Sequence, residues 1–356
     1  MKMNRKILGA AALIGSLICG CTGKGAAEET AVPETPTAAA TEAAVATEAT
    51  VTEPAPETTA APEDPAEEIV ARIGALKGPT SIGLLEMIGR EESNYSFTME
   101  TQADALLPEM VSGNLDIALV PANVASVLYN KTQGGVAVID INTLGVLYMV
   151  SGDPQIQSIS DLDGRTICLT GKGTTPEFVL RHVMAGAGIE CNVEYKSEPT
   201  EVVATLAEDP QAVGMLPQPF ATVACRKNEA LRVVLDMTAE WEQLDAESAL
   251  VTGVTIVRRE FLEEHPDLVE AFLREHGESS EYAKENTAET AERMVAQGIL
   301  ENAAVAEEAI PYCHLVCIEG QEMQTKLASY LEVLYNEDPA SVGGALPGED
   351  FYYCAD

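Results

Sequence analysis

The stretch DLDGRTICLTGKGTTPEFVLRHVMAGAGIE, Asp161 to Glu190, decides the fold of this chain. Arg165 to Thr170 alternates and is rich in β-formers, which predicts a strand. The polar, glycine-rich segment Gly171 to Thr175 interrupts this pattern, and Pro176 then begins a predicted helix with Thr175 as its N-cap. The loop therefore lies at a helix N-terminus, where free backbone N–H groups favour an anion or a strong hydrogen-bond acceptor.

The same order of strand, polar loop and helix recurs along the chain. Three more predicted strands end in short loops that lead into helices: Lys77 to Ser81, Pro121 to Asn123, and Pro217 to Pro219. Strands that alternate with helices through short connections predict an α/β fold with mainly parallel sheets. In such sheets ligands bind beyond the carboxyl ends of the strands, which is where these loops lie.

The loop side chains suit a small polar ligand. Gly78 and Gly173 permit close approach of the backbone, and the hydroxyl residues can either donate to a ligand or simply cap helices. Lys77 and Lys172 could pair with an anion or could be ordinary exposed lysines. The candidate ligand-binding residues are Lys77, Gly78, Pro79, Thr80, Ser81, Pro121, Asn123, Gly171, Lys172, Gly173, Thr174, Thr175, Gln218 and Pro219.

The N-terminus has the features of an exported, anchored protein. Basic residues precede an apolar stretch at 7–18 that is short for a membrane span, which predicts a signal peptide at 1–20. Ile18-Cys19-Gly20-Cys21 resembles a bacterial lipobox and implies lipid on Cys21, with ordinary secretion as the alternative. Residues 21–65, rich in Ala, Thr, Glu and Pro, predict a disordered tether, and the remaining 66–356 is long enough for two lobes.

Composition and missing motifs narrow the function. The formal net charge of −36 makes nucleic acid a poor partner. No dinucleotide-binding fingerprint, P-loop or nucleophile elbow occurs, and the histidines fall outside the loops, so we expect neither a catalytic histidine nor a cofactor. For Cys313-His314 and Cys317 we expect a packed helical turn and no metal, Cys168 should be a buried thiol, and Trp241 should be a packed aromatic rather than a ligand-stacking one. The pairing of the six cysteines of 66–356 stays open.

Four segments resemble a known family: the opening stretch, GMLPQPFA at 214–221, TGVTIVRREFLEEHPDLVEAFL at 252–273, and DIALVPANVASVLYN at 116–130. They resemble substrate-binding proteins of ABC importers, more narrowly the branch of nitrate, sulfonate, taurine and thiamine-precursor binders. The resemblance implies a type II periplasmic-binding-protein fold, with two α/β lobes joined by two hinge strands. Lobe one would be 66–150 plus 253–356 and lobe two 151–252, with hinges near Val150–Ser151 and Thr252–Gly253.

The resemblance also implies a function without catalysis. The protein would be a monomer on the outer face of the cytoplasmic membrane, held by lipidated Cys21, that delivers a small solute to an ABC permease with its ATPase. An oxyanion such as a sulfonate suits the helix N-termini, whereas an organic solute suits the acidic chain better. Two alternatives remain: an enzyme on the same fold, as in menaquinone biosynthesis, and a sensor domain without a transporter.

Overall fold

A computed structural model describes residues 69–90, 93–244 and 248–354 of the chain. The predicted signal peptide at 1–20, Cys21 and the tether at 21–65 lie outside these residues and stay predictions. Among the helices of the described part, none combines the length and the apolar character needed to cross a membrane.

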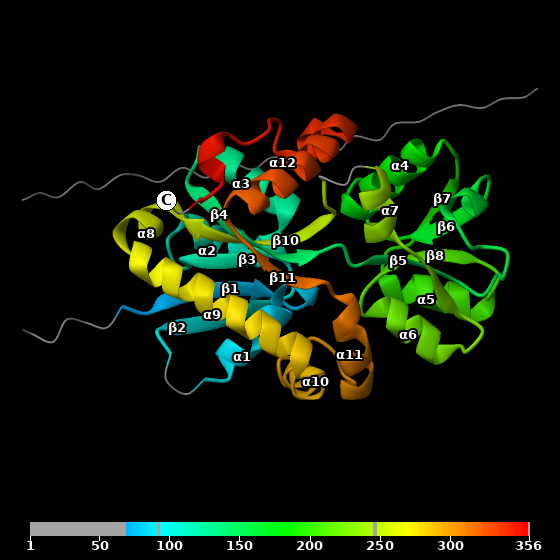
Figure 1. The fold of residues 1–356 in the computed structure, drawn as a ribbon, viewed down its shortest axis with the longest axis horizontal. Coiled ribbons are helices and arrows are strands. Elements are labelled where there is room, and N and C mark those ends of the chain that lie inside the picture. Colours follow the sequence, from blue (N-terminus) through cyan, green and yellow to red (C-terminus); the bar gives the residue numbers. More distant parts are fainter. Residues whose placement is uncertain (1–68, 91–92, 245–247, 355–356) are drawn as a thin grey trace, which may run out of the picture. The chain divides into compact units, whose positions relative to one another are not determined.

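Two sheets form the framework of the described part (Figure 1), with strand orders β11-β4-β10-β3-β1-β2 and β7-β6-β8-β5-β9. The strands are β1 Ala71–Leu76, β2 Tyr95–Glu100, β3 Ile117–Pro121, β4 Val136–Leu144, β5 Leu147–Ser151, β6 Thr166–Leu169, β7 Asn192–Tyr195, β8 Val213–Pro217, β9 Arg232–Asp236, β10 Val251–Arg258 and β11 Leu315–Ile318. We call the six-stranded sheet with its helices the first lobe and the five-stranded sheet with its helices the second lobe.

Helices connect and cover the strands. They are α1 Leu85–Ile88, α2 Ala103–Val111, α3 Ala122–Thr132, α4 Thr175–Ala187, α5 Pro199–Glu208, α6 Phe220–Lys227, α7 Met237–Leu244, α8 Arg259–Glu264, α9 Pro266–Glu285, α10 Thr287–Ala296, α11 Ala303–Ala309 and α12 Gly320–Glu337. Short 3₁₀ turns add η1 Pro79–Leu84, η2 Ile159–Leu162, η3 Ile310–Tyr312, η4 Pro339–Val342 and η5 Glu349–Phe351.

The predicted α/β class is confirmed, but the expectation of mainly parallel sheets is wrong, because both sheets are mixed. β1 runs parallel to β2 and β3, and β6 runs parallel to β7 and β8. β10 is antiparallel to β3 and β4, and β5 is antiparallel to β8 and β9. These antiparallel pairs involve β5 and β10, the first strand after each passage of the chain into a sheet, because each lies between strands that run the opposite way.

The chain crosses between the sheets earlier than the family pattern implies. β4 ends in the first sheet at Leu144 and β5 begins in the second sheet at Leu147, so the expected hinge at Val150–Ser151 lies inside β5. The return crossing lies between β9 and β10, before the expected Thr252–Gly253. Gly145 lies at this first crossing between the sheets. A larger residue would not fit there without a shift, because a Cβ would lie only 2.1 Å from Thr238 Oγ1.

Side chains along the central strands of the first sheet point alternately to its two faces, and each face packs into its own hydrophobic core. One side chain set, including Ile73, Leu119 and Ile139, packs with Phe272 of α9. The opposite set, including Val120 and Val138, packs with Leu327 of α12. The two faces of the sheet are thus both covered, which suits the continuously apolar strand β3.

Individual sequence predictions fare differently in the core. Cys168 is buried, and Trp241 is fully buried with its Nε1 donating to Ser248 Oγ at 3.0 Å, so both interpretations are confirmed. The predicted helical turn at Cys313–Cys317 is wrong: a bend at Cys313 leads into the edge strand β11, which pairs with β4. β11 has four residues, too few for a helix and a strand to be told apart by periodicity.

Candidate functional site

The loop after β1 is largely interior. Lys77 is exposed, but Thr80 and Ser81 are buried, and Ser81 Oγ donates to Gly78 O at 3.1 Å. Thr80 lies against Gly253 of β10, since a Cβ on that glycine would come within 2.5 Å of Thr80 Cγ2. Only the first residues of this loop therefore remain open to a ligand without rearrangement.

The loop after β6 lies at the surface, as a ligand-binding loop should. Helix α4 begins at Thr175, so the N-cap is Thr174 and not Thr175 as expected from the sequence. Thr174 Oγ1 donates to Gly171 O at 2.7 Å, which closes the loop on itself. The ammonium of Lys172 lies over the Tyr195 ring, 5.3 Å from its centroid, so within this structure it faces its own lobe.

A carboxylate already occupies the N-terminus of α4. Glu177 is 3% exposed, accepts the Gly173 N–H at 2.7 Å and forms an ion pair with Arg181. Burial alone would raise the pKa of Glu177, but the Gly173 N–H, the Tyr195 hydroxyl and Arg181 outweigh it and lower the pKa. The Glu177 carboxylate therefore already neutralises the positive N-terminal end of α4, which disfavours binding of a second anion there.

In the two remaining loops, Asn123 and Gln218 already form hydrogen bonds within the protein. Asn123 Nδ2 donates to Ser341 O at 3.4 Å. The buried Gln218 accepts from Thr222 Oγ1 at 2.9 Å, and its backbone N–H donates to Val146 O at the first crossing. In the second lobe, Thr175 lies beside the buried Tyr330 of α12 and offsets part of the rise that burial causes in the pKa of Tyr330. No hydrogen bond of the described residues joins Lys77–Ser81 to Gly171–Thr175.

A cavity of about 510 Å³ lies between the lobes at the first crossing, and sequence reasoning did not find it. The second lobe contributes Asp236, Thr238, Ala239 and Glu242 from β9 and α7. The first lobe contributes Leu144, Lys284, Ile310, Pro311, His314, Leu315 and Val316. These two groups are far apart in the chain, and the Cys313-His314 pair was their only conspicuous sequence feature.

His314 organises the wall of this cavity. Its backbone φ is +44°, in a region that non-glycine residues seldom adopt. The side chain pairs through Nδ1 with Gly145 O at 2.5 Å, and its Nε2 lies 3.4 Å from Tyr148 Oη and 3.8 Å from Asp236 Oδ2. His314 thus connects β11 to the crossing and to the end of β9. Contrary to expectation, it lies outside any helix.

A second cavity, of about 880 Å³, lies between α6 and the connection from α10 to α11. Phe220 and Val223 give it apolar walls on one side, and Ile299 and Leu300 do so on the other. Lys77 reaches towards this region, with its Nζ 3.4 Å from where a Cβ on Gly298 would lie. Arg226 of α6 also forms an ion pair with Glu308 of α11 across the lobes.

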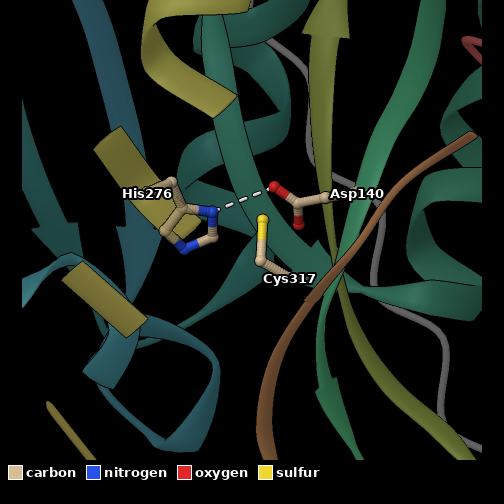
Figure 2. Close-up of side chains that lie close together, drawn as sticks. All are labelled: Asp140, His276 and Cys317. Carbon is tan, nitrogen blue, oxygen red and sulfur yellow. Dashed lines mark hydrogen bonds and ion pairs between the residues drawn. The ribbon is translucent and has the colours of Figure 1, made fainter. Parts of the chain in front are cut away.

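One group of side chains could hold a metal ion, and it joins Cys317 to residues other than the Cys313-His314 pair considered from the sequence. Asp140 of β4, His276 of α9 and Cys317 of β11 converge in the first lobe (Figure 2), with their ligand atoms all within 4.8 Å of one another. Asp140 and His276 are fully buried, and His276 Nδ1 lies 2.9 Å from Asp140 Oδ2. Burial, reinforced by the Asp140 carboxylate, raises the pKa of the Cys317 thiol.

Comparison with solved structures supports the fold. An ABC transporter protein from Parabacteroides distasonis aligns with a TM-score of 0.68 and 20% identity, over 80% of this chain and 98% of its own. The periplasmic aliphatic sulphonate-binding protein SsuA from Escherichia coli gives a TM-score of 0.62 and 15% identity, over 80% and 96%. A sulfonate ABC transporter's periplasmic SsuA from Methylobacillus flagellatus gives 0.54 and 15%, over 78% and 88%.

At these identities the likeness concerns the fold, and the expected similarity to substrate-binding proteins of ABC importers is confirmed at that level. No curated protein matches the chain. The family model described as menaquinone biosynthesis matches residues 79–310, more than half of the chain and both lobes. The chain therefore belongs to the menaquinone biosynthesis family.

Proposed function

We propose that this chain is an extracytoplasmic solute-binding protein that captures a small organic molecule between its two lobes. The observation that carries this proposal is the cavity of about 510 Å³, lined from both lobes beside the first crossing. Its volume lies in the range of small-molecule sites, which is roughly 300 to 1,000 Å³. Closure of two lobes about such a crossing is a common way to enclose a solute.

The lining favours an organic solute that is neutral or positively charged. Asp236 and Glu242 are acidic, and Lys284 is the one basic residue besides His314 among the described residues that line the cavity. Ile310 and Leu315 give apolar contact. Glu177 already neutralises the N-terminus of α4. A sulfonate or nitrate would meet these carboxylates and the acidic chain, which raises its cost of binding.

The transport role rests on the N-terminal sequence together with the fold. Lipid on Cys21 and a tether at 21–65 would hold a monomeric receptor near the outer face of the cytoplasmic membrane, within reach of an ABC permease. In the described structure the cavity is lined by none of the four candidate loops, Lys77–Ser81, Pro121–Asn123, Gly171–Thr175 and Gln218–Pro219. We propose that these loops contact the solute only as the lobes close further. A permease and an ATPase encoded beside this chain would support an importer over a sensor.

A thermal-shift screen of the full-length chain tests the binding role. Heterocyclic cations, neutral pyrimidines, alkanesulfonates and nitrate form the panel, and calorimetry follows each hit. We expect a stabilising hit among the first two classes, and hits confined to sulfonates and nitrate would contradict the solute class.

The second candidate is an enzyme, which the family model favours. Each solute that binds should be incubated with excess protein and analysed by mass spectrometry. Recovery of unchanged solute supports a receptor, whereas stoichiometric conversion to a product of different mass would establish catalysis instead.

A further inference from the structure

The side chains of Asp140, His276 and Cys317 are arranged like the ligands of a metal site, and they would need to move only slightly closer together to bind an ion. The three residues come from β4, α9 and β11, and Figure 2 shows the carboxylate, the imidazole Nδ1 and the thiol pointing towards one another. Since Asp140 and His276 are fully buried, their positions are determined by packing in the core of the first lobe.

The donor set selects the kind of ion. One carboxylate oxygen, one imidazole nitrogen and one thiolate sulfur form the mixed set that Zn²⁺ accepts, in a tetrahedral arrangement. Ca²⁺ and Mg²⁺ prefer oxygen ligands alone, and a thiolate excludes them. In a tetrahedral zinc site the sulfur and oxygen ligands lie about 3.5 Å apart, so the present separations of up to 4.8 Å need only modest contraction.

Cys317 is the ligand that can make this adjustment. It is only partly buried, and its Sγ has weak contacts, 4.0 Å from Leu273 O and 3.6 Å from Glu319 Oε1. Glu319 follows β11 directly, and its carboxylate lies on the same side as the thiol. It can therefore supply the fourth ligand, or a water molecule can take that position.

The surroundings of the ligands suit an ion that binds at Nδ1. Thr255 Oγ1 donates to Asp140 Oδ1 at 2.7 Å and so fixes the carboxylate, as the outer shell of metal sites commonly does. On zinc binding the thiol proton would leave to solvent, and the neutral imidazole would carry its proton on Nε2. In the described structure that nitrogen is buried without a hydrogen-bond partner, as is the Ser280 hydroxyl, and both atoms border Gly83.

We propose that Asp140, His276 and Cys317 bind one Zn²⁺-type ion, with Glu319 or water as fourth ligand, and that this ion fastens α9 and β11 to β4. The site lies on the inner side of η1, which carries Thr80 and Ser81 of the first candidate loop. Bound metal would therefore brace that loop from behind without contacting the solute cavity. The metal site does not depend on which solute the protein binds.

Metal titration of the full-length chain tests the proposal. After treatment with EDTA and a reducing agent, the protein should bind one Zn²⁺ per chain by calorimetry and elemental analysis. Co²⁺ used as a probe should give the absorption of a thiolate-to-metal charge transfer. Zn²⁺ at about a hundredfold excess over its Kd should raise the Tm by about 5 °C.

Two cysteine variants separate a site from general thiol binding. Cys317→Ser should abolish the charge-transfer band and weaken Zn²⁺ binding more than about 100-fold, since loss of a ligand exceeds the usual effect of an outer-shell change. Cys191→Ser, also partly buried but in the second lobe, should keep both signals. Asp140→Asn should weaken binding while it retains most of the packing.

Three results would overturn the proposal. They are no stoichiometric uptake by the reduced protein, equal uptake by Cys317→Ser and wild type, and a native disulfide at Cys317 in exported protein. A folded Cys317→Ser variant, judged by circular dichroism, keeps the comparison valid even if Asp140→Asn fails to fold.

Discussion

Lys77–Ser81 and Gly171–Thr175 have nearly the same sequence pattern but opposite surroundings. Both follow a strand, contain glycine and paired hydroxyl residues, and lead into helical structure. In the first loop the hydroxyl residues are buried, with Thr80 against Gly253 of β10, and Gly83 of the same turn borders His276 and Ser280. In the second loop Thr174 is exposed, and a carboxylate of its own helix lies behind the backbone.

The difference shows that a local pattern determines the shape of a loop but not its role. The first loop is supported by α9 and β11, elements that come far later in the chain, so its hydroxyl groups belong to the interior. The second loop is supported by Glu177, only two residues beyond Thr175, and its outer face stays free. We therefore expect changes behind the first loop to affect stability and changes in the second to affect binding.

The largest effect should come from the polar group behind the first loop. Asp140→Ala, measured by urea unfolding with EDTA present, should lower the free energy of unfolding by about 3 kcal/mol, because His276 Nδ1 and Thr255 Oγ1 lose a buried partner. Glu177→Ala behind the second loop should lower it by about 1 kcal/mol. Equal losses would contradict the distinction between the two loops.

The second loop should contribute more to solute affinity than the first loop. For any solute found by the screen, Thr174→Ala combined with Thr175→Ala should weaken binding more than about tenfold, or about 1.4 kcal/mol, while the fold survives.

Ser81→Ala is the matched control for that double variant. It removes a hydrogen bond to Gly78 O inside the first loop and should reduce stability by about 1 kcal/mol. Unchanged affinity in the double variant would remove Thr174 and Thr175 from the binding site.

The loop glycines should also differ. Gly173 has φ +70°, so Gly173→Ala should cost about 1 kcal/mol of unfolding free energy. Gly78 has φ 169°, an extended conformation open to any residue, and a Cβ there would meet nothing within 4 Å. Gly78→Ala should therefore leave stability within about 0.5 kcal/mol of wild type, and chemical denaturation of both variants provides the check.

The smallest effect should be a pH dependence that belongs to the second loop. The pKa of Glu177 is lower in the folded chain than its ordinary value, so its contribution to stability is present above that ordinary value. The contribution is lost as the pH falls through the lowered pKa. Between pH 6 and pH 3, Glu177→Gln should therefore lose less stability than wild type, and parallel pH profiles would contradict this account.

Much of the fold could be predicted because its units are local. The strand and the helix start that the opening stretch predicts, at Arg165 to Thr170 and Pro176, lie within a residue or two of β6 and of the start of α4, because alternation and proline are local signals. Strand direction is not local: β10 lies between β3 and β4 only because of packing across the whole first lobe. The run Leu144–Val150 gave no signal that the chain changes sheets at Gly145, since both neighbours of that glycine, Leu144 and Val146, are apolar.

The site was predictable only in part for the same reason. The four loops could be named because each follows its own strand. His314 and Asp236 face one cavity, and Asp140, His276 and Cys317 form one group, through contacts between segments far apart in the chain. Without those contacts His314 looked like one more helical histidine, and Cys317 had no visible partner.

The strand order also bears on how the chain assembles. The second sheet uses one continuous segment from β5 to β9, so its strands can pair as soon as that segment is available. The first sheet also needs β10 and β11. Because β4 pairs with both of these later strands, it cannot complete its pairing until they have been synthesised. Such distant pairings slow folding, because loop closure precedes the contacts that reward it. The lobe that begins the chain is thus the one that is completed last.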